Sequence, residues 1–202
     1  MKKMISIPVS FDATAVTIQG ACMGFAAIRL IEDEIPTYLN SIGLRSPNTE
    51  VSALWLQDRY VSNVHKGSPR LFDLAHIEES YSVFFPVRLT STDNTQSLTF
   101  MPCAHSGKTG LDFLSNLKET PFIIYVCPED ADPHAISVTQ DKLPLSHCKI
   151  NDTHLSGFSL IIPKSRLEHH LQDSIIRVFE NGIDEQWQDL KGSIQFIFLR
   201  EK

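Results

Sequence analysis

The separation of a helical first part from a strand-rich second part is the feature that most limits how this chain can fold. Apolar residues recur at helical spacing in 21–34 and 46–67, whereas short apolar or alternating segments follow one another after residue 81. Helices and strands in separate parts of a chain are typical of α+β folds with an antiparallel sheet, and alternating βαβ units are typical of parallel sheets. We therefore expect one α+β domain over 1–202, with a helical lobe at about 20–79 and a mostly antiparallel sheet at about 81–202.

The second part of the chain has a regular series of expected elements. Strands are expected at 82–90, 97–101, 122–127, 134–139, 146–150, 157–163 and 192–201, and helices at 109–119 and 164–180. The run FIIYVC at 122–127 is continuously apolar, as expected for a strand buried on both faces. Pro36 ends or restarts the first helix, residues 3–18 form an extended segment, and 68–79 have no clear pattern.

The composition excludes several classes of function. The hydrophobic content of 42% and the charged content of 21% are ordinary for a globular domain. A net charge of −6 argues against a dominant nucleic-acid role, which needs a concentrated positive surface. We expect no membrane span and no cleavable signal peptide, because no apolar segment is long enough. Four cysteines in 202 residues do not make a disulfide framework, so we expect reduced thiols and a reducing compartment.

The stretch GACMGFAAI at 20–28 places a cysteine at the expected N-terminus of the first helix. The thiolate is the nucleophilic form of cysteine, and a helix N-terminus or a neighbouring imidazolium stabilises it. Cys22 lies where the first effect would act. Gly20 and Gly24 are expected to leave room for a substrate backbone.

Among the eight histidines, His134 has the most suitable surroundings for a catalytic partner. It follows a polar loop with Pro133 and opens a short alternating strand. The next strand ends in Asn151 and Asp152, and an antiparallel return brings these residues back toward the histidine. A carboxylate or an amide at that point would accept the second ring N–H of His134 and fix its orientation.

These motifs resemble those of the papain-like cysteine proteases, and within them the YopT-type bacterial effector proteases. The resemblance rests on Gly-x-Cys-x-Gly before an apolar helix, His-Ala opening a strand, and an acidic residue at the end of the next strand, within about 16–165. It implies a papain-like fold with Cys22 as nucleophile, His134 as general base and Asp152 as the orienting group. Asn151 and Asp141 remain alternatives for the third role, and Gln19 is the candidate oxyanion-hole side chain.

The resemblance also implies an activity and a setting. A thiol hydrolase of this kind acts on a protein or peptide substrate and needs no cofactor. Peptide hydrolysis is the first expectation, and deamidation, transglutamination or other acyl transfer uses the same residues. The implied location is the cytoplasm, or the interior of a host cell reached without a cleavable signal peptide. The sequence does not indicate an oligomeric state.

Three other interpretations compete with the enzyme. In MPCAHSGKTG at 101–110, Gly107, Lys108 and Thr109 match a phosphate-binding P-loop, but Pro102 replaces its first glycine and removes an amide donor. A zinc site built from Cys103, His105, Cys127, His134, His147 and Cys148 lacks the usual ligand spacing, and the adjacent His169 and His170 point to different faces of a helix. A small acidic α+β domain also suits a non-enzymatic adaptor, chaperone or immunity protein.

Overall fold

The computed structural model describes residues 21–41, 49–92, 95–117, 121–140, 143–155, 158–181 and 189–202. The expected extended segment at 3–18, the oxyanion candidate Gln19, Gly20 and the alternative acid Asp141 lie outside these residues. No helix within these ranges has the length and apolar character needed to cross a bilayer.

Helices and strands are arranged as an α+β fold, which confirms the expected class. The helices are α1 (Cys22–Glu34), α2 (Pro36–Ser41), α3 (Thr49–His65), α4 (Gly110–Asn116) and α5 (Leu167–Glu180), the last preceded by a 3₁₀ turn at Lys164–Arg166. The strands are β1 (Ile77–Tyr81), β2 (Phe85–Thr92), β3 (Thr95–Phe100), β4 (Phe122–Pro128), β5 (His134–Thr139), β6 (His147–Asn151), β7 (Ser159–Pro163) and β8 (Asp189–Glu201).

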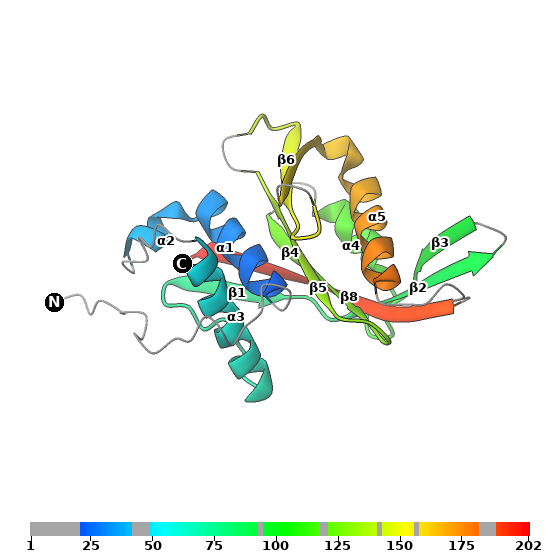
Figure 1. Ribbon diagram of the computed structural model, residues 1–202, viewed down its shortest axis with the longest axis horizontal. Coiled ribbons are helices and arrows are strands. Elements are labelled where there is room, and N and C mark those ends of the chain that lie inside the picture. The colour runs from blue at the N-terminus through cyan, green and yellow to red at the C-terminus, as the bar shows by residue number, and fades with distance from the viewer. Residues whose placement is uncertain are drawn as a thin grey trace.

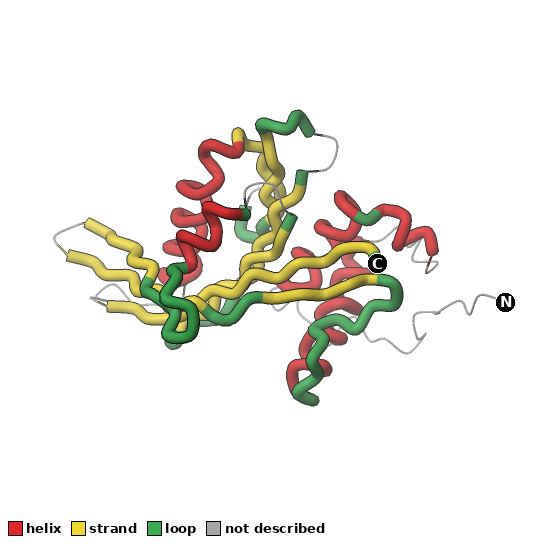
Figure 2. The backbone as a smooth tube through the Cα atoms, turned by 180° about the vertical axis from the view of Figure 1, so that it is seen from behind, coloured by secondary structure: helices red, strands yellow, loops and turns green. Residues whose placement is uncertain are grey.

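The described strands form one sheet in the order β3-β2-β8-β4-β5-β6-β7, and every pairing in it is antiparallel. The long strand β8 pairs with β4 along one side. Along its other side, residues 189–194 of β8 pair with β2, and residues 197–201 pair with β1. Figure 2 shows β8 extending from the β2–β3 hairpin to the helical part of the molecule.

Helices cover both faces of this sheet, as Figure 1 shows for α1 and α3 on one side and α5 on the other. The strand β4 explains the arrangement, because its side chains alternate between two apolar cores. Phe122, Ile124 and Val126 pack into the core beneath α4 and α5. Ile123 packs into the core beneath α1 and α3. The continuously apolar run at 122–127 therefore has the two-sided burial expected of it.

The close approach of α1 to α3 depends on Gly24. A Cβ atom at this position would lie 1.9 Å from the carbonyl oxygen of Ala53 on α3, a distance that no side chain tolerates. The backbone N–H of Gly24 donates to Oε1 of Gln57, also on α3, at 2.9 Å. The expectation that Gly24 opens the approach to a substrate is therefore wrong, since its missing side chain lets two helices pack together.

Candidate active site

The sulfur of Cys22 lies at the first residue of α1, where the positive end of the helix dipole acts. No side chain caps the helix at Ala21, and Gln57 accepts the N–H of Gly24. Within the described part of the chain, the N–H groups of Cys22 and Met23 have no acceptor. No described residue therefore competes with a negatively charged oxygen for these two amide donors beside the thiol.

His134 opens β5, and Asp152 directly follows β6, the neighbouring strand of the sheet. The antiparallel return brings the two side chains together, with Nε2 of His134 at 2.7 Å from Oδ1 of Asp152. Each residue is only 4% exposed, so water hardly competes for this hydrogen bond. The same Oδ1 atom accepts the backbone N–H of His154 at 2.9 Å, which fixes the carboxylate.

Cys22 reaches the loop that carries the histidine. Its thiol donates to the carbonyl oxygen of Pro133 at 3.8 Å, one residue before His134. Because Nε2 of His134 is taken by Asp152, the other ring nitrogen is the one left for the thiol. Residues from α1, β5 and the end of β6 therefore meet at one point.

The charges at this point stabilise an imidazolium. Burial lowers the pKa of His134, but its hydrogen bonds with Asp152 and with the Cys22 thiol outweigh burial and raise that pKa to about 9. Burial raises the pKa of Asp152, but the hydrogen bonds from His134 and from the His154 backbone leave it below its ordinary value. The pair is thus arranged as a carboxylate beside a protonated ring.

Asn151 and Asp152 are adjacent but face different partners. The Nδ2 group of Asn151 donates to the hydroxyl of Ser137 at 3.2 Å and to that of Thr139 at 3.5 Å. Its Oδ1 atom is buried and has no partner within the described residues. Asp152 is therefore the residue of this pair that contacts His134.

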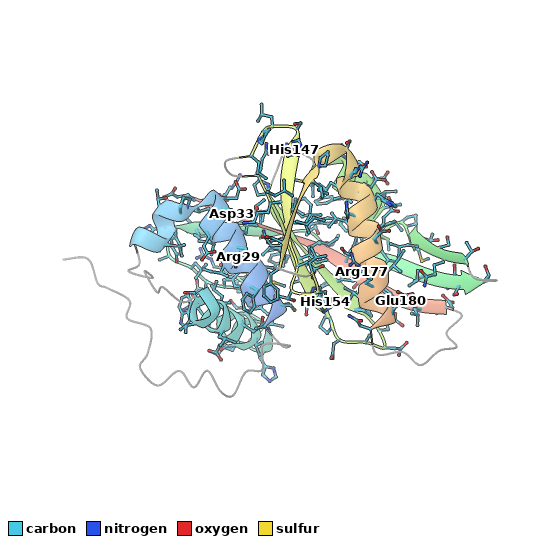
Figure 3. All side chains as sticks on the ribbon, turned by 45° about the horizontal axis from the view of Figure 1, so that its top comes forward. Arg29, Asp33, His147, His154, Arg177 and Glu180 are labelled. Carbon is cyan, nitrogen blue, oxygen red and sulfur yellow. The ribbon has the colours of Figure 1, made fainter. Side chains whose placement is uncertain are left out.

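His154 is a neighbour that the sequence did not indicate. Its imidazole lies flat on that of His134, with ring centroids 3.8 Å apart and planes only 8° from parallel. Figure 3 shows His154 in the turn after β6, toward the helix that carries Arg177 and Glu180. Donor atoms of His134, Asp152 and His154 lie within 4.8 Å of one another, the spacing of a metal site. However, imidazole binds metals in the plane of its ring, so two parallel stacked rings do not direct their nitrogens at one ion.

A shallow hollow of about 10 Å³ adjoins Cys22. The α1 helix lines it with Phe25, Ala26 and Arg29, and the sheet side contributes Asn151 and Phe158 among others. Its polar lining comes from Arg29, Asn151, Asp152 and Thr153, and its volume is that of about one water molecule, too small for a side chain. Figure 3 shows Arg29 and Asp33 along the α1 helix beside this region.

A half-buried polar cluster near Cys22 was also not indicated by the sequence. Tyr60 of α3 and Tyr125 of β4 are hydrogen-bonded, with ring centroids 5.9 Å apart, and Tyr125 also bonds the Cys127 thiol. Burial raises the pKa values of Tyr60 and Tyr125 and brings that of the Cys127 thiol to about 11. Cys127 is therefore held as a neutral thiol, and its chemistry differs from what a helix N-terminus offers Cys22.

The P-loop-like stretch has a structural role. The N–H groups of Ser106 and Gly107 both donate to the carbonyl of Cys103, and the Cys103 N–H donates to that of Lys108. These amides are thus used within the loop instead of facing a phosphate. Thr109 caps α4 in a reciprocal pair with Asp112, as Ser or Thr does in a capping box.

Packing accounts for two of the cysteines that were considered as zinc ligands. All four cysteines are free thiols, and Cys103 and Cys148 lie in the apolar core beneath α5. Small apolar side chains of this kind are common core residues.

Comparisons with known proteins give little further information. No family model matches the chain, and no curated protein matches its sequence. Among solved structures, the crystal structure of Pseudomonas avirulence protein AvrPphB aligns over 92% of this chain and 99% of its own, with a TM-score of 0.48 and 8% identity. Values this low do not support a functional conclusion.

Proposed function

We propose that this protein is a cysteine-dependent hydrolase or acyl-transferring enzyme with Cys22 as nucleophile, His134 as general base and Asp152 as the orienting group. The observation that carries the proposal is the buried 2.7 Å hydrogen bond between His134 and Asp152, next to a cysteine at a helix N-terminus. A nucleophile, a base and a group that orients the base are the minimum set for thiol catalysis of acyl transfer.

The reaction follows from the roles of these groups. The Cys22 thiolate attacks a carbonyl carbon while His134 holds the proton taken from the thiol. The N–H groups of Cys22 and Met23 donate to the oxygen that becomes negative, where fixed donors in a partly dry site are most effective. His134 then gives its proton to the leaving group, and Asp152 stabilises the imidazolium throughout. A second nucleophile releases the acyl group and restores the thiol.

The resemblance to papain-like effector proteases favours a protein or peptide substrate. Water as the second nucleophile gives peptide hydrolysis or, at a side-chain amide, deamidation. An amine in its place gives transglutamination. By the same resemblance, the protein acts as a bacterial effector inside a host cell, where thiols stay reduced.

The test is the pH dependence of iodoacetamide labelling, followed at each of the four cysteines of the folded protein by mass spectrometry. A free thiol reacts appreciably only near its normal pKa of about 8.5. We expect Cys22 to label rapidly near pH 6 and Cys127, the half-buried control, to stay unreactive. In His134→Ala, fast labelling at pH 6 should disappear. If the Cys22 thiol reacts only after denaturation, the proposed enzymatic function is refuted and a non-enzymatic adaptor is favoured.

A further inference from the structure

The ring of His154 covers the otherwise buried His134. His134 is 4% exposed, whereas His154 has one face on His134 and the other toward solvent. The backbone N–H of His154 binds the carboxylate that orients His134, so the ring that covers the histidine is anchored to the same atom as the histidine. His154, His134 and Asp152 therefore form one connected cluster.

Two imidazoles stacked at 3.8 Å form a stable pair when one ring is protonated, but not when both are. A cation over a neutral aromatic face is attracted to it, whereas two like charges this close repel strongly. The hydrogen bond to Asp152 keeps the proton on His134. His154 is therefore the ring that must stay neutral for the stack to hold.

The other groups that face His154 agree with this division. Arg177 of α5 adds a second positive charge, and Asp152 from the same turn adds a negative one that is already bound to His134. Nδ2 of Asn181, at the end of α5, lies 3.5 Å from Nδ1 of His154 and is uncharged. Burial, the charge of His134 and that of Arg177 together lower the pKa of His154.

We propose that His154 is a positioning residue that responds to pH: its neutral ring holds His134 against Asp152, and gaining a proton drives it off the stack and exposes the pair to water. This inference rests on the proposed function. In acid the His134–Asp152 pair would lose its cover when the ring of His154 gains its proton. The site would then lose its alignment as His154 takes up its proton and recover it when that proton leaves.

The experiment compares His154→Phe, which keeps a flat ring without a proton to gain, with His154→Ala, which removes the ring. His147→Phe, at the other end of β6, is the matched control. The readout is the rate of Cys22 labelling by iodoacetamide between pH 4 and 8. We expect His154→Phe to keep its reactivity to about one pH unit lower than the wild type, the shift that a like charge at this distance produces. We expect His154→Ala to label about tenfold more slowly at pH 6 to 7, the loss usual when a group that orients a functional histidine is removed.

An identical acid limb in the wild type and His154→Phe would overturn the inference, as would unchanged labelling in His154→Ala. NMR titration of the imidazole protons reports directly on the contact between His134 and His154. This readout therefore does not depend on whether the proposed enzymatic function is correct. In the wild type, the imidazole proton shifts of His134 should change over the pH range in which His154 titrates, and in His154→Phe they should not. If Cys22 labels slowly but the NMR signals of His134 and His154 titrate together, only the proposed function is refuted. If Cys22 labels rapidly but the NMR signals of the two imidazoles titrate independently, only the role of His154 is refuted.

Discussion

Replacement of Asp152 by Asn tests whether the buried His134–Asp152 pair organises the site. Asp152 accepts from Nε2 of His134 at 2.7 Å and from the backbone N–H of His154 at 2.9 Å, and it is 4% exposed. The Asp152→Asn variant keeps one carbonyl oxygen but loses the negative charge. His134 would then remain buried without the group that favours its protonated form.

The magnitude follows from the cost of separating buried charges. Removing one partner of a buried ion pair costs about 3–5 kcal/mol. Because the amide keeps one acceptor for a neutral hydrogen bond, we expect Asp152→Asn to lower the free energy of unfolding by about 2–3 kcal/mol at pH 6. Since burial alone lowers the pKa of His134, its ring should become neutral at pH 6 to 7. Fast labelling of Cys22 at pH 6 should fall at least about tenfold.

Urea unfolding and iodoacetamide labelling of Cys22 measure the two effects separately. Asp33→Asn is the matched control, since Asp33 also forms a half-buried ion pair, with Lys149 at 2.9 Å, away from His134. It should lose some stability and keep its labelling rate. If Asp152→Asn unfolds at the same urea concentration as the wild type and labels as fast, Asp152 does not stabilise an imidazolium and the reasoning fails.

Three further predictions concern the fold and its pH dependence. Gly24→Ala should destabilise the protein by about 3 kcal/mol in urea unfolding, at the upper end of the range for overpacking, because backbone blocks the new methyl group; Gly110→Ala, whose nearest obstacle is a side chain, should cost clearly less. The His134–Asp152 pair should contribute most to stability between about pH 4 and 6.5, because the pKa of His134 is raised from 6.5 to about 9 and that of Asp152 is lowered from 3.8. Urea unfolding should therefore show a contribution that is lost as pH rises through about 9, and Asp152→Asn should lack it; an equal pH dependence in both proteins would contradict this. Thr109→Ala should cost about 1 kcal/mol through the lost cap of α4, and an unchanged urea midpoint would argue against that cap.

The parts of the fold that the sequence predicted are those that local patterns determine. The strand at 134–139 has the predicted limits, because a polar loop with Pro133 precedes it and the alternating run HAISVT ends at Thr139. The first helix begins one residue later than expected, at Cys22. Residues 77–81 gave no strand signal, since IEESY is largely polar; they become β1 only because β8, more than a hundred residues later, offers a free side.

The candidate site likewise has residues that the sequence predicted and residues that only the folded structure reveals. Chemical type and chain order pointed to Cys22, His134 and Asp152, and the antiparallel return of two neighbouring strands is what brings the last two together. The stacking of His154 depends on the turn after β6, and the role of Gly24 depends on how closely α3 approaches. Neither contact leaves a local pattern, because each joins residues whose distance is set by packing.

The position of β8 has a consequence for how the protein is made. The strand follows all its partners in the sequence, yet β1, β2 and β4 all pair with it. While the ribosome is still synthesising the chain, the apolar strand β4 has one open side, and β1 and β2 lack this partner. Such an exposed strand is prone to pair with other chains, so the nascent protein depends on delayed folding or on a chaperone until residues 189–201 emerge.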